Sequence, residues 1–250
     1  MMKTMNKSTS ERIQKVLARQ GYGSRREIEH WVKAGRIKLN HKIANLGDKV
    51  CFKDTLLLDD KLIPINRASS AVTEIILYHK PQGEVSARRD DKFPTVFENL
   101  PPCQNGRWVM VGRLDVSTSG LLLFTNDGEL ANRLMHPSNE IPRKYLVRVH
   151  GLLTPEKCQN LQSGVQLSDG IAKFEKMILL PKKGTNQWVQ VVLKEGRNRE
   201  VKRLFETQGC DVTRLIRIAF GKVNLPRDLA PGSWRALDLN LNKQAFSDLL

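Results

Sequence analysis

Residues 112–128 read GRLDVSTSGLLLFTNDG, a polar loop followed by an apolar run and a turn. The run 120–125 predicts a buried β-strand because it is short, apolar and bounded by turn-forming residues. The Asn-Asp-Gly sequence at 126–128 predicts a turn whose aspartate caps the next helix. The loop presents Arg113 and Asp115 on a rigid support, a position in which catalytic groups are often found. Composition alone leaves another interpretation open, in which Asp115 is an ordinary turn residue.

The regions on either side of this stretch predict more strands than helices. Runs of β-branched or alternating apolar residues indicate strands, and capped segments with helical spacing indicate helices. The expected strands are 73–78, 107–111, 120–125, 145–149, 188–193, 214–218 and 234–239, and the expected helices are 128–134, 152–164 and 200–208. We expect mostly antiparallel strands with flanking helices, which places this larger domain in the α+β class.

A smaller domain precedes the larger one. Residues 11–34 predict two short helices, the second beginning at a capping box formed by Ser24 and Glu27. Short strands follow, and the chain becomes polar after Leu58. We therefore expect a small domain at 10–61, a linker at 62–73 and the larger domain at 74–245.

Positive charge is concentrated in the small domain. The chain carries a net charge of +15, and residues 1–70 hold 15 Lys and Arg against 7 Asp and Glu. Such a surplus attracts polyanions and favours nucleic acid as a partner. The cations expected to line one phosphate-binding face are Arg12, Lys15, Arg25, Arg26, Arg36 and Lys38. A solvated charged face without a ligand is the alternative.

Common metal, cofactor and membrane signatures are absent from the sequence. The four cysteines lie about fifty residues apart and the five histidines lack metal-ligand spacing, so we expect no metal site. No glycine-rich nucleotide-binding motif and no serine-hydrolase motif occurs, so we expect no cofactor. No apolar run is long enough to span a membrane and no signal peptide is present, so we expect a cytoplasmic protein.

The small domain carries a recognisable pattern of basic and glycine residues. The pattern comprises Arg12-Ile13-x-Lys15-x-Leu17, Gly23-Ser24-Arg25-Arg26, Gly35-Arg36-Ile37 and Gly47-Asp48. It resembles the S4 RNA-binding domain. The resemblance implies binding to folded RNA through shape and backbone contacts, as expected for A-form helices whose major groove excludes side chains.

The larger domain carries an ordered series of motifs. They are Lys80-Pro81-x-Gly83, Gly112-Arg113-Leu114-Asp115, Asp127-Gly128-Glu129-Leu130-Ala131, His136-Pro137, Lys144-Tyr145, Gly164-Val165-Gln166-Leu167, Glu195-Gly196-Arg197-Asn198-Arg199-Glu200-Val201, Arg203-Leu204 and Leu215-Ile216-Arg217. The series resembles the pseudouridine synthases, in the branch that has an S4 domain and acts on ribosomal RNA hairpins. The resemblance implies an isomerase that acts on ribosomal RNA, with a large-subunit hairpin as the expected substrate and a monomer as the expected state.

The resemblance also implies a role for individual residues. Asp115 corresponds to the essential aspartate, and Tyr145 to a tyrosine that packs against the target base. Lys202 corresponds to a basic residue that pairs with the aspartate. Leu215 corresponds to an apolar wall of the pocket, and Arg113 would hold an RNA phosphate. Taken singly, each has a structural alternative, such as a core tyrosine or a solvated lysine.

The implied reaction agrees with the absence of cofactor motifs. Pseudouridine formation breaks the bond from C1′ to N1, turns the uracil and rejoins it through C5, without net redox change. The uridine has to leave its stack, and an aromatic platform offsets part of that cost. Asp115 can act as a nucleophile at C1′ or remove the 2′ proton, and the sequence leaves both open.

Three other functions are compatible with parts of the sequence. A glycosidase needs a second carboxylate, for which Asp127 and Glu129 are candidates. A non-catalytic, ribosome-associated S4-type RNA-binding protein would share the composition and the small domain. A synthase acting on 16S rather than 23S rRNA would share every motif given above.

Overall fold

The computed structural model describes residues 10–65, 72–181 and 186–237. The described residues form two compact units. The first unit takes the chain up to residue 73 together with 102–108 and 126–128, and the second takes the remaining residues. Residues 66–71 of the predicted linker and 238–245 of the predicted larger domain lie outside the described residues. No helix in the described ranges has the length and apolar character needed to cross a bilayer.

Two short helices and six short strands build the first unit. They are β1 (Glu11–Arg12), α1 (Ile13–Arg19), α2 (Arg25–Lys33), β2 (Ile37–Leu39), β3 (Lys42–Ile43), β4 (Lys49–Val50), β5 (Leu56–Leu58) and β6 (Lys61–Ile63). The capping box is confirmed, because the Ser24 hydroxyl accepts from the Glu27 amide at 3.1 Å and the Ser24 amide donates to the Glu27 carboxylate at 3.2 Å. The apolar faces of both helices pack with the strands around the buried Leu17, Ile28 and Leu56.

A four-stranded antiparallel sheet, in the order β3-β2-β5-β6, completes this unit. The turn between β2 and β3 is formed by Asn40 and His41, both with positive φ, as a tight hairpin turn requires. Strand β6 pairs with β5, Leu57 lying opposite Leu62. Residues 62 and 63, predicted as linker, are therefore part of the sheet.

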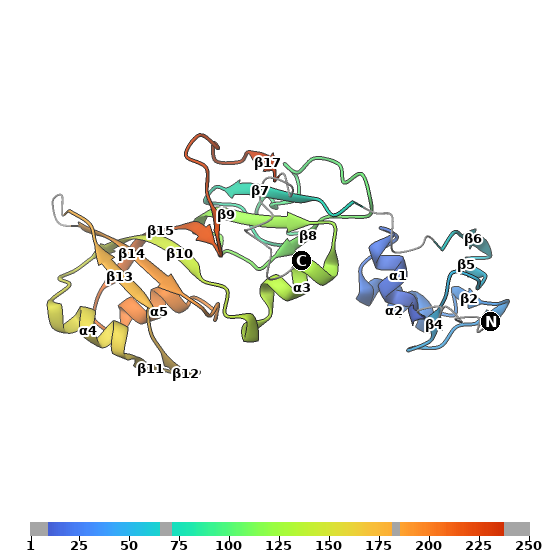
Figure 1. The fold of residues 1–250 in the computed structure, drawn as a ribbon, viewed down its shortest axis with the longest axis horizontal. Coiled ribbons are helices and arrows are strands. Elements are labelled where there is room, and N and C mark those ends of the chain that lie inside the picture. Colours follow the sequence, from blue (N-terminus) through green and yellow to red (C-terminus); the bar gives the residue numbers. More distant parts are fainter. Residues whose placement is uncertain (1–9, 66–71, 182–185, 238–250) are drawn as a thin grey trace, which may run out of the picture. The chain divides into compact units, whose positions relative to one another are not determined.

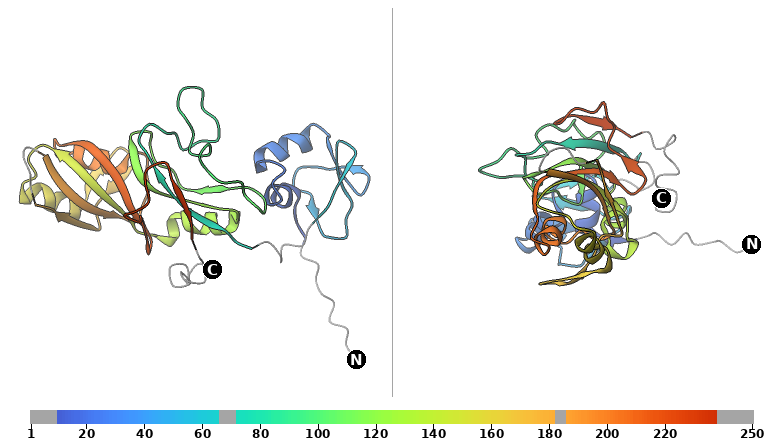
Figure 2. Two further views of the ribbon diagram at one scale, coloured as in Figure 1. Left: turned by 90° about the horizontal axis from the view of Figure 1, so that it is seen from above. Right: turned by 90° about the vertical axis from the view of Figure 1, so that its left-hand side faces the viewer.

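The second unit is built on one large sheet. Its elements are β7 (Ile75–Lys80), β8 (Val109–Val111), β9 (Thr118–Thr125), α3 (Gly128–Met135), the 3-10 turn Pro137–Asn139, β10 (Arg143–His150), α4 (Pro155–Ser163), β11 (Val165–Leu167), β12 (Gly170–Ala172), β13 (Lys176–Leu179), β14 (Asn186–Leu193), α5 (Glu200–Glu206), β15 (Asp211–Phe220), β16 (Val223–Asn224) and β17 (Trp234–Ala236). Helices α4 and α5 lie together on one face of the β13-β14-β10-β15 half of the sheet (Figures 1 and 2).

The strand order of the large sheet is β13-β14-β10-β15-β9-β7-β17, with β16 on β15 and β8 on β9. Every pairing in the described sheet is antiparallel except that of β15 with β9. The α+β prediction is therefore confirmed. The single parallel pairing of the described sheet joins its two halves, next to the loop that carries Asp115.

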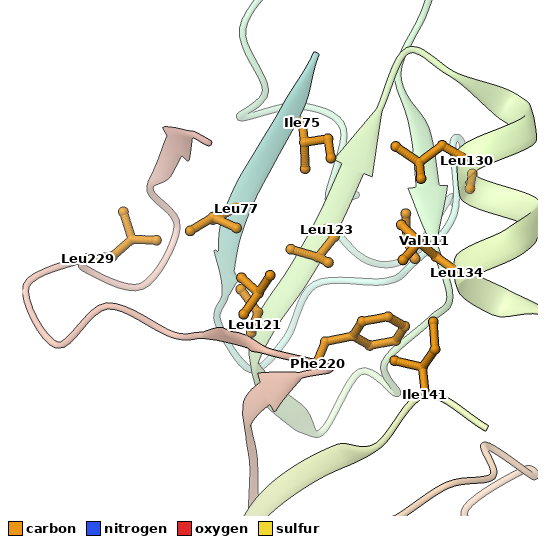
Figure 3. Close-up of a cluster of buried hydrophobic side chains, with 12 residues drawn as sticks. Ile75, Leu77, Val111, Leu121, Leu123, Leu130, Leu134, Ile141, Phe220 and Leu229 are labelled. Carbon is orange, nitrogen blue, oxygen red and sulfur yellow. The ribbon is translucent and has the colours of Figure 1, made fainter. Parts of the chain in front are cut away.

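The other half of the sheet has its own core under α3. Leu130 and Leu134 of the helix face Val111 and Leu123 on the neighbouring strands (Figure 3). Phe220, at the end of β15, packs into the same cluster and ties the two halves together. Each of these five side chains is almost completely buried, so the loop before β9 starts from a rigid base.

Candidate active site

The loop that carries Asp115 leaves β8 and enters β9. Gly112 takes the left-handed conformation, with φ of 76°, and the Thr118 amide donates to the carbonyl of Asp115 at 3.0 Å. Leu114 is buried beneath the loop, and its amide and carbonyl both bind the hydroxyl of Ser86, at 3.1 and 2.7 Å. The loop is thus anchored on both sides, while the Asp115 side chain remains exposed.

A buried lysine holds the other side of this loop. Lys80 is completely buried, and its Nζ donates to the carbonyls of Pro81 and Thr118, each at 2.9 Å, and to that of Val116 at 3.4 Å. Burial lowers the pKa of Lys80 to about 8, while Glu84 and Asp115 act in the opposite direction. From the sequence, Lys80 was expected only within a turn and as part of the motif Lys80-Pro81-x-Gly83, without a role of its own in the site. The missed signal was a lysine in an otherwise apolar strand, which needs buried acceptors.

A cavity of about 200 Å³ opens beside the loop. Four residues singled out from the sequence line it, namely Arg113, Asp115, Tyr145 and Leu215. They come from the loop before β9, from β10 and from β15. Tyr145 and Leu215 are buried, with 9% and 5% of their surface exposed, so they form walls, whereas Asp115 lies at the opening.

Strand register explains why these distant residues meet. Leu215 lies opposite Thr118 in the parallel pair and opposite Val147 in the antiparallel pair. In the same way Arg217 lies opposite Gly120 and Tyr145. Because neighbouring residues in register point to the same face of a sheet, all of these side chains project toward one side.

The expected pairing of Lys202 with Asp115 is not present. The Lys202 Nζ donates instead to the hydroxyl of Ser117 at 2.7 Å, and within the described chain no carboxylate forms an ion pair with it. Lys202 lies near the start of α5, from where its flexible side chain reaches the turn two residues beyond Asp115. In the described structure Lys202 thus contacts the loop through Ser117 rather than through Asp115.

Two arginines of the cavity were not foreseen as site residues. Arg143 and Arg217 are both buried and lie against the ring of Phe220, at 5.3 and 5.4 Å from its centre. Arg143 donates to the carbonyl of Lys194 at 2.5 Å, and Arg217 donates from Nε to the carbonyl of Leu121 at 2.7 Å. Burial lowers the pKa of both guanidinium groups. The signal in the sequence was an arginine at an inward-facing position of each strand.

Two glutamates also line the cavity, so Asp115 is not its single carboxylate. Glu195 pairs with the Nε of Arg197 at 2.5 Å. Glu200 is buried and accepts from the backbone amide of Arg197 at 3.0 Å, and burial raises its pKa. Both glutamates are therefore engaged by Arg197. Asp127 and Glu129, the second carboxylates considered from the sequence, are not among the described residues that line the cavity.

The basic residues of the first unit differ in their surroundings. Lys15 pairs with Glu11 at 2.9 Å, Arg36 with Asp59 and Lys38 with Asp60. The remaining predicted RNA-binding residues, Arg12, Arg25 and Arg26, are exposed and have no carboxylate within 4.0 Å among the described residues. These three side chains are therefore open to an external anion.

Comparisons with known proteins give matches over most of the chain. Residues 74–207 match the family model described as RNA pseudouridylate synthase, and residues 11–56 match the S4 domain. The chain is 50% identical, over 92% of its length, to ribosomal large subunit pseudouridine synthase B of Yersinia pestis and covers 73% of that protein. For the protein of the same name from Escherichia coli K12, the identity is 51% over 92% of this chain and 80% of the relative.

A solved structure resembles the fold over almost the whole chain. It is described as a crystal structure of pseudouridylate synthase, and it superimposes with a TM-score of 0.64. The match covers 94% of this chain and 99% of the other, at 25% sequence identity.

Proposed function

The chain belongs to the RNA pseudouridylate synthase family, and we propose that it isomerises one specific uridine of 23S ribosomal RNA to pseudouridine. The observation that carries the proposal is the cavity in which the exposed Asp115 faces the walls formed by Tyr145 and Leu215. The large-subunit substrate is taken from the names of the relatives that are about half identical to this chain. We further propose that the enzyme acts as a cytoplasmic monomer.

Each residue has a distinct task in this proposal. The target uridine flips out of its helix and enters the cavity, where Tyr145 packs against the base and offsets part of the unstacking cost. Asp115 either attacks C1′ or removes the 2′ proton, and in both cases the bond from C1′ to N1 breaks. The freed uracil turns, C5 bonds to C1′, and the proton lost from C5 is balanced by one gained at N1. Atoms and electrons balance, so no cofactor is needed.

The function is tested by incubating the full-length chain with protein-free 23S and 16S rRNA and mapping pseudouridine in each. We expect one new pseudouridine in 23S rRNA. A product found only in 16S rRNA would show that the substrate is 16S rRNA, with the proposed reaction unchanged. Tight binding to either RNA without any pseudouridine would identify a non-catalytic binding protein instead.

The S4 domain is proposed to dock RNA through its unpaired arginines. Replacing Arg25 and Arg26 by alanine removes two charges that no described carboxylate neutralises. We expect the slope of log affinity against log salt to fall by about 2, because each phosphate contact contributes about 1. Filter binding of the substrate hairpin at several salt concentrations measures the slope.

The matched control removes a pair of opposite charges from the same domain. Replacing both Arg36 and Asp59 by alanine leaves the net charge unchanged, because the two form an ion pair at the surface. We expect this variant to keep the wild-type slope. Equal slopes for the wild type and the Arg25 and Arg26 variant would reject the docking role.

A further inference from the structure

Two buried polar atoms that line the cavity lack a hydrogen-bond partner. They are the Oγ1 of Thr118 and the Nη2 of Arg217, both without a partner among the described residues. Both residues are 2% exposed. An unsatisfied buried polar group destabilises the folded protein, and a charged group does so more than a neutral one. Two such groups in one cavity indicate that a ligand supplies the missing partners.

The backbone fixes both groups on the same face of the sheet. Thr118 and Gly120 lie in register with Leu215 and Arg217 along the parallel pair. Gly120 has no side chain, and a Cβ there would approach the carbonyl oxygen of Arg217 to 2.3 Å. The Arg217 backbone is therefore held close against β9, and its side chain is fixed by the bond from Nε to the carbonyl of Leu121. Such support holds polar groups in place before a ligand arrives.

The size and chemistry of the cavity limit what this ligand can be. Its volume of about 200 Å³ is below the ~300–1,000 Å³ of ordinary small-molecule sites, so it suits one flipped base. Phosphates are better served at the rim, where Arg113 and Arg199 are exposed. Inside the cavity, the acceptors available to a protein donor are then the carbonyl oxygens of the base. In uracil these oxygens flank the N3–H donor.

We propose that Arg217 and Thr118 determine specificity by reading the polar edge of the flipped uracil. Arg217 donates to a carbonyl oxygen, and the Thr118 hydroxyl binds the adjacent N3–H. Cytosine presents an amino group in place of O4 and a bare N3. A guanidinium at O4 would meet a second donor there, and the Thr118 hydroxyl would have to turn from acceptor to donor. A site built to hydrogen-bond its substrate discriminates strongly against a base that lacks the partner. This inference rests on the proposed function and deepens it.

The Thr118→Val variant gives the cleanest test, because valine keeps the shape and removes only the hydroxyl. The hydroxyl has no described partner, so thermal unfolding should show unchanged or increased stability. We expect kcat/KM on the uridine hairpin to fall about 3- to 10-fold, the value of one neutral hydrogen bond. Unchanged kcat/KM in the folded variant would overturn the role of Thr118.

Arg217 is tested by combining its replacement with a change in the base. Single-turnover rates are measured for the full-length wild type and Arg217→Met on hairpins with uridine, 2-thiouridine or 4-thiouridine at the target, since sulfur accepts hydrogen bonds poorly. One thio substitution should slow the wild type about 10- to 100-fold. The Arg217→Met variant should convert uridine as slowly as the wild type converts that thio base. Placing the same thio base in the substrate of the variant should not slow it further. If the rate loss of the variant and the rate loss of the thio base multiply, Arg217 does not bind that carbonyl oxygen, because independent effects are additive in free energy.

A control and a second readout keep this test decisive. Arg143→Met is the control, because it removes the other arginine that lies against Phe220. The Nη1 of Arg143 already donates to a backbone carbonyl, so the rate loss of this variant should multiply with the rate loss of either thio base. If Arg217→Met does not fold, the rates of the wild type decide. A slower rate on one thio substrate supports the contact of Arg217 with a carbonyl oxygen. Equal rates on the uridine, 2-thiouridine and 4-thiouridine hairpins overturn it. Absence of pseudouridine on every hairpin would refute the proposed function itself.

Discussion

Replacing Asp115 by asparagine should reduce pseudouridine formation by about 10⁴-fold, a loss comparable to removal of one essential catalytic carboxylate in other enzymes. Asparagine keeps the size of the side chain and removes its charge, so it neither attacks C1′ nor accepts the 2′ proton. Asp115 is exposed and its loop is held by Ser86 and Lys80, so stability should hardly change. Single-turnover assays on the substrate hairpin measure the rate, and thermal unfolding verifies the fold.

The affinity of this variant for RNA separates chemistry from binding. We expect the dissociation constant of the hairpin to remain close to that of the wild type, because docking rests on other residues. The matched variant is Glu195→Gln, another acid of the same cavity, which is already paired with Arg197. It should lose far less activity than Asp115→Asn. Equal losses in the two variants would indicate a two-carboxylate mechanism of the glycosidase type.

Replacing Gly120 by alanine should destabilise the second unit by about 3–5 kcal/mol, the combined cost of a crowded contact and a strained backbone. The added Cβ would lie 2.3 Å from the carbonyl oxygen and 2.6 Å from the amide nitrogen of Arg217. Both are backbone atoms, so no side chain can move aside. In addition, Gly120 has φ of 110°, which residues with a Cβ rarely adopt.

The effect should reach the active site because Gly120 lies in the parallel pair of β9 and β15. This pairing brings the Asp115 loop next to Leu215 and Arg217, so its loss separates the walls of the cavity. Urea denaturation measures the change in the free energy of unfolding. Gly209→Ala is the control, since Gly209 also has positive φ but nothing within 4 Å of the added Cβ. A similar loss for both variants would show that backbone strain, rather than the strand contact, dominates.

Local signals in the sequence were sufficient for much of this protein. The capping box at Ser24 and the buried strand after Asp115 each depend on a few adjacent residues, and each was predicted. The ordered motifs further identified the family, which the comparisons bear out. Site residues that lie within such motifs, Asp115 and Tyr145, were therefore available from the sequence.

The arrangement around Asp115 was decided only by the tertiary structure. Arg217 binds the carbonyl of Leu121 across 96 residues, and no local pattern encodes that register. For the same reason Lys202 was assigned to Asp115 rather than to Ser117, 85 residues away. The free energy of strand pairing depends on the whole sheet, whereas helix caps and turns depend on neighbours in the chain. The sequence by itself thus indicated the candidate catalytic residues, and the parallel pairing of β9 with β15 in the described sheet decided which of them meet.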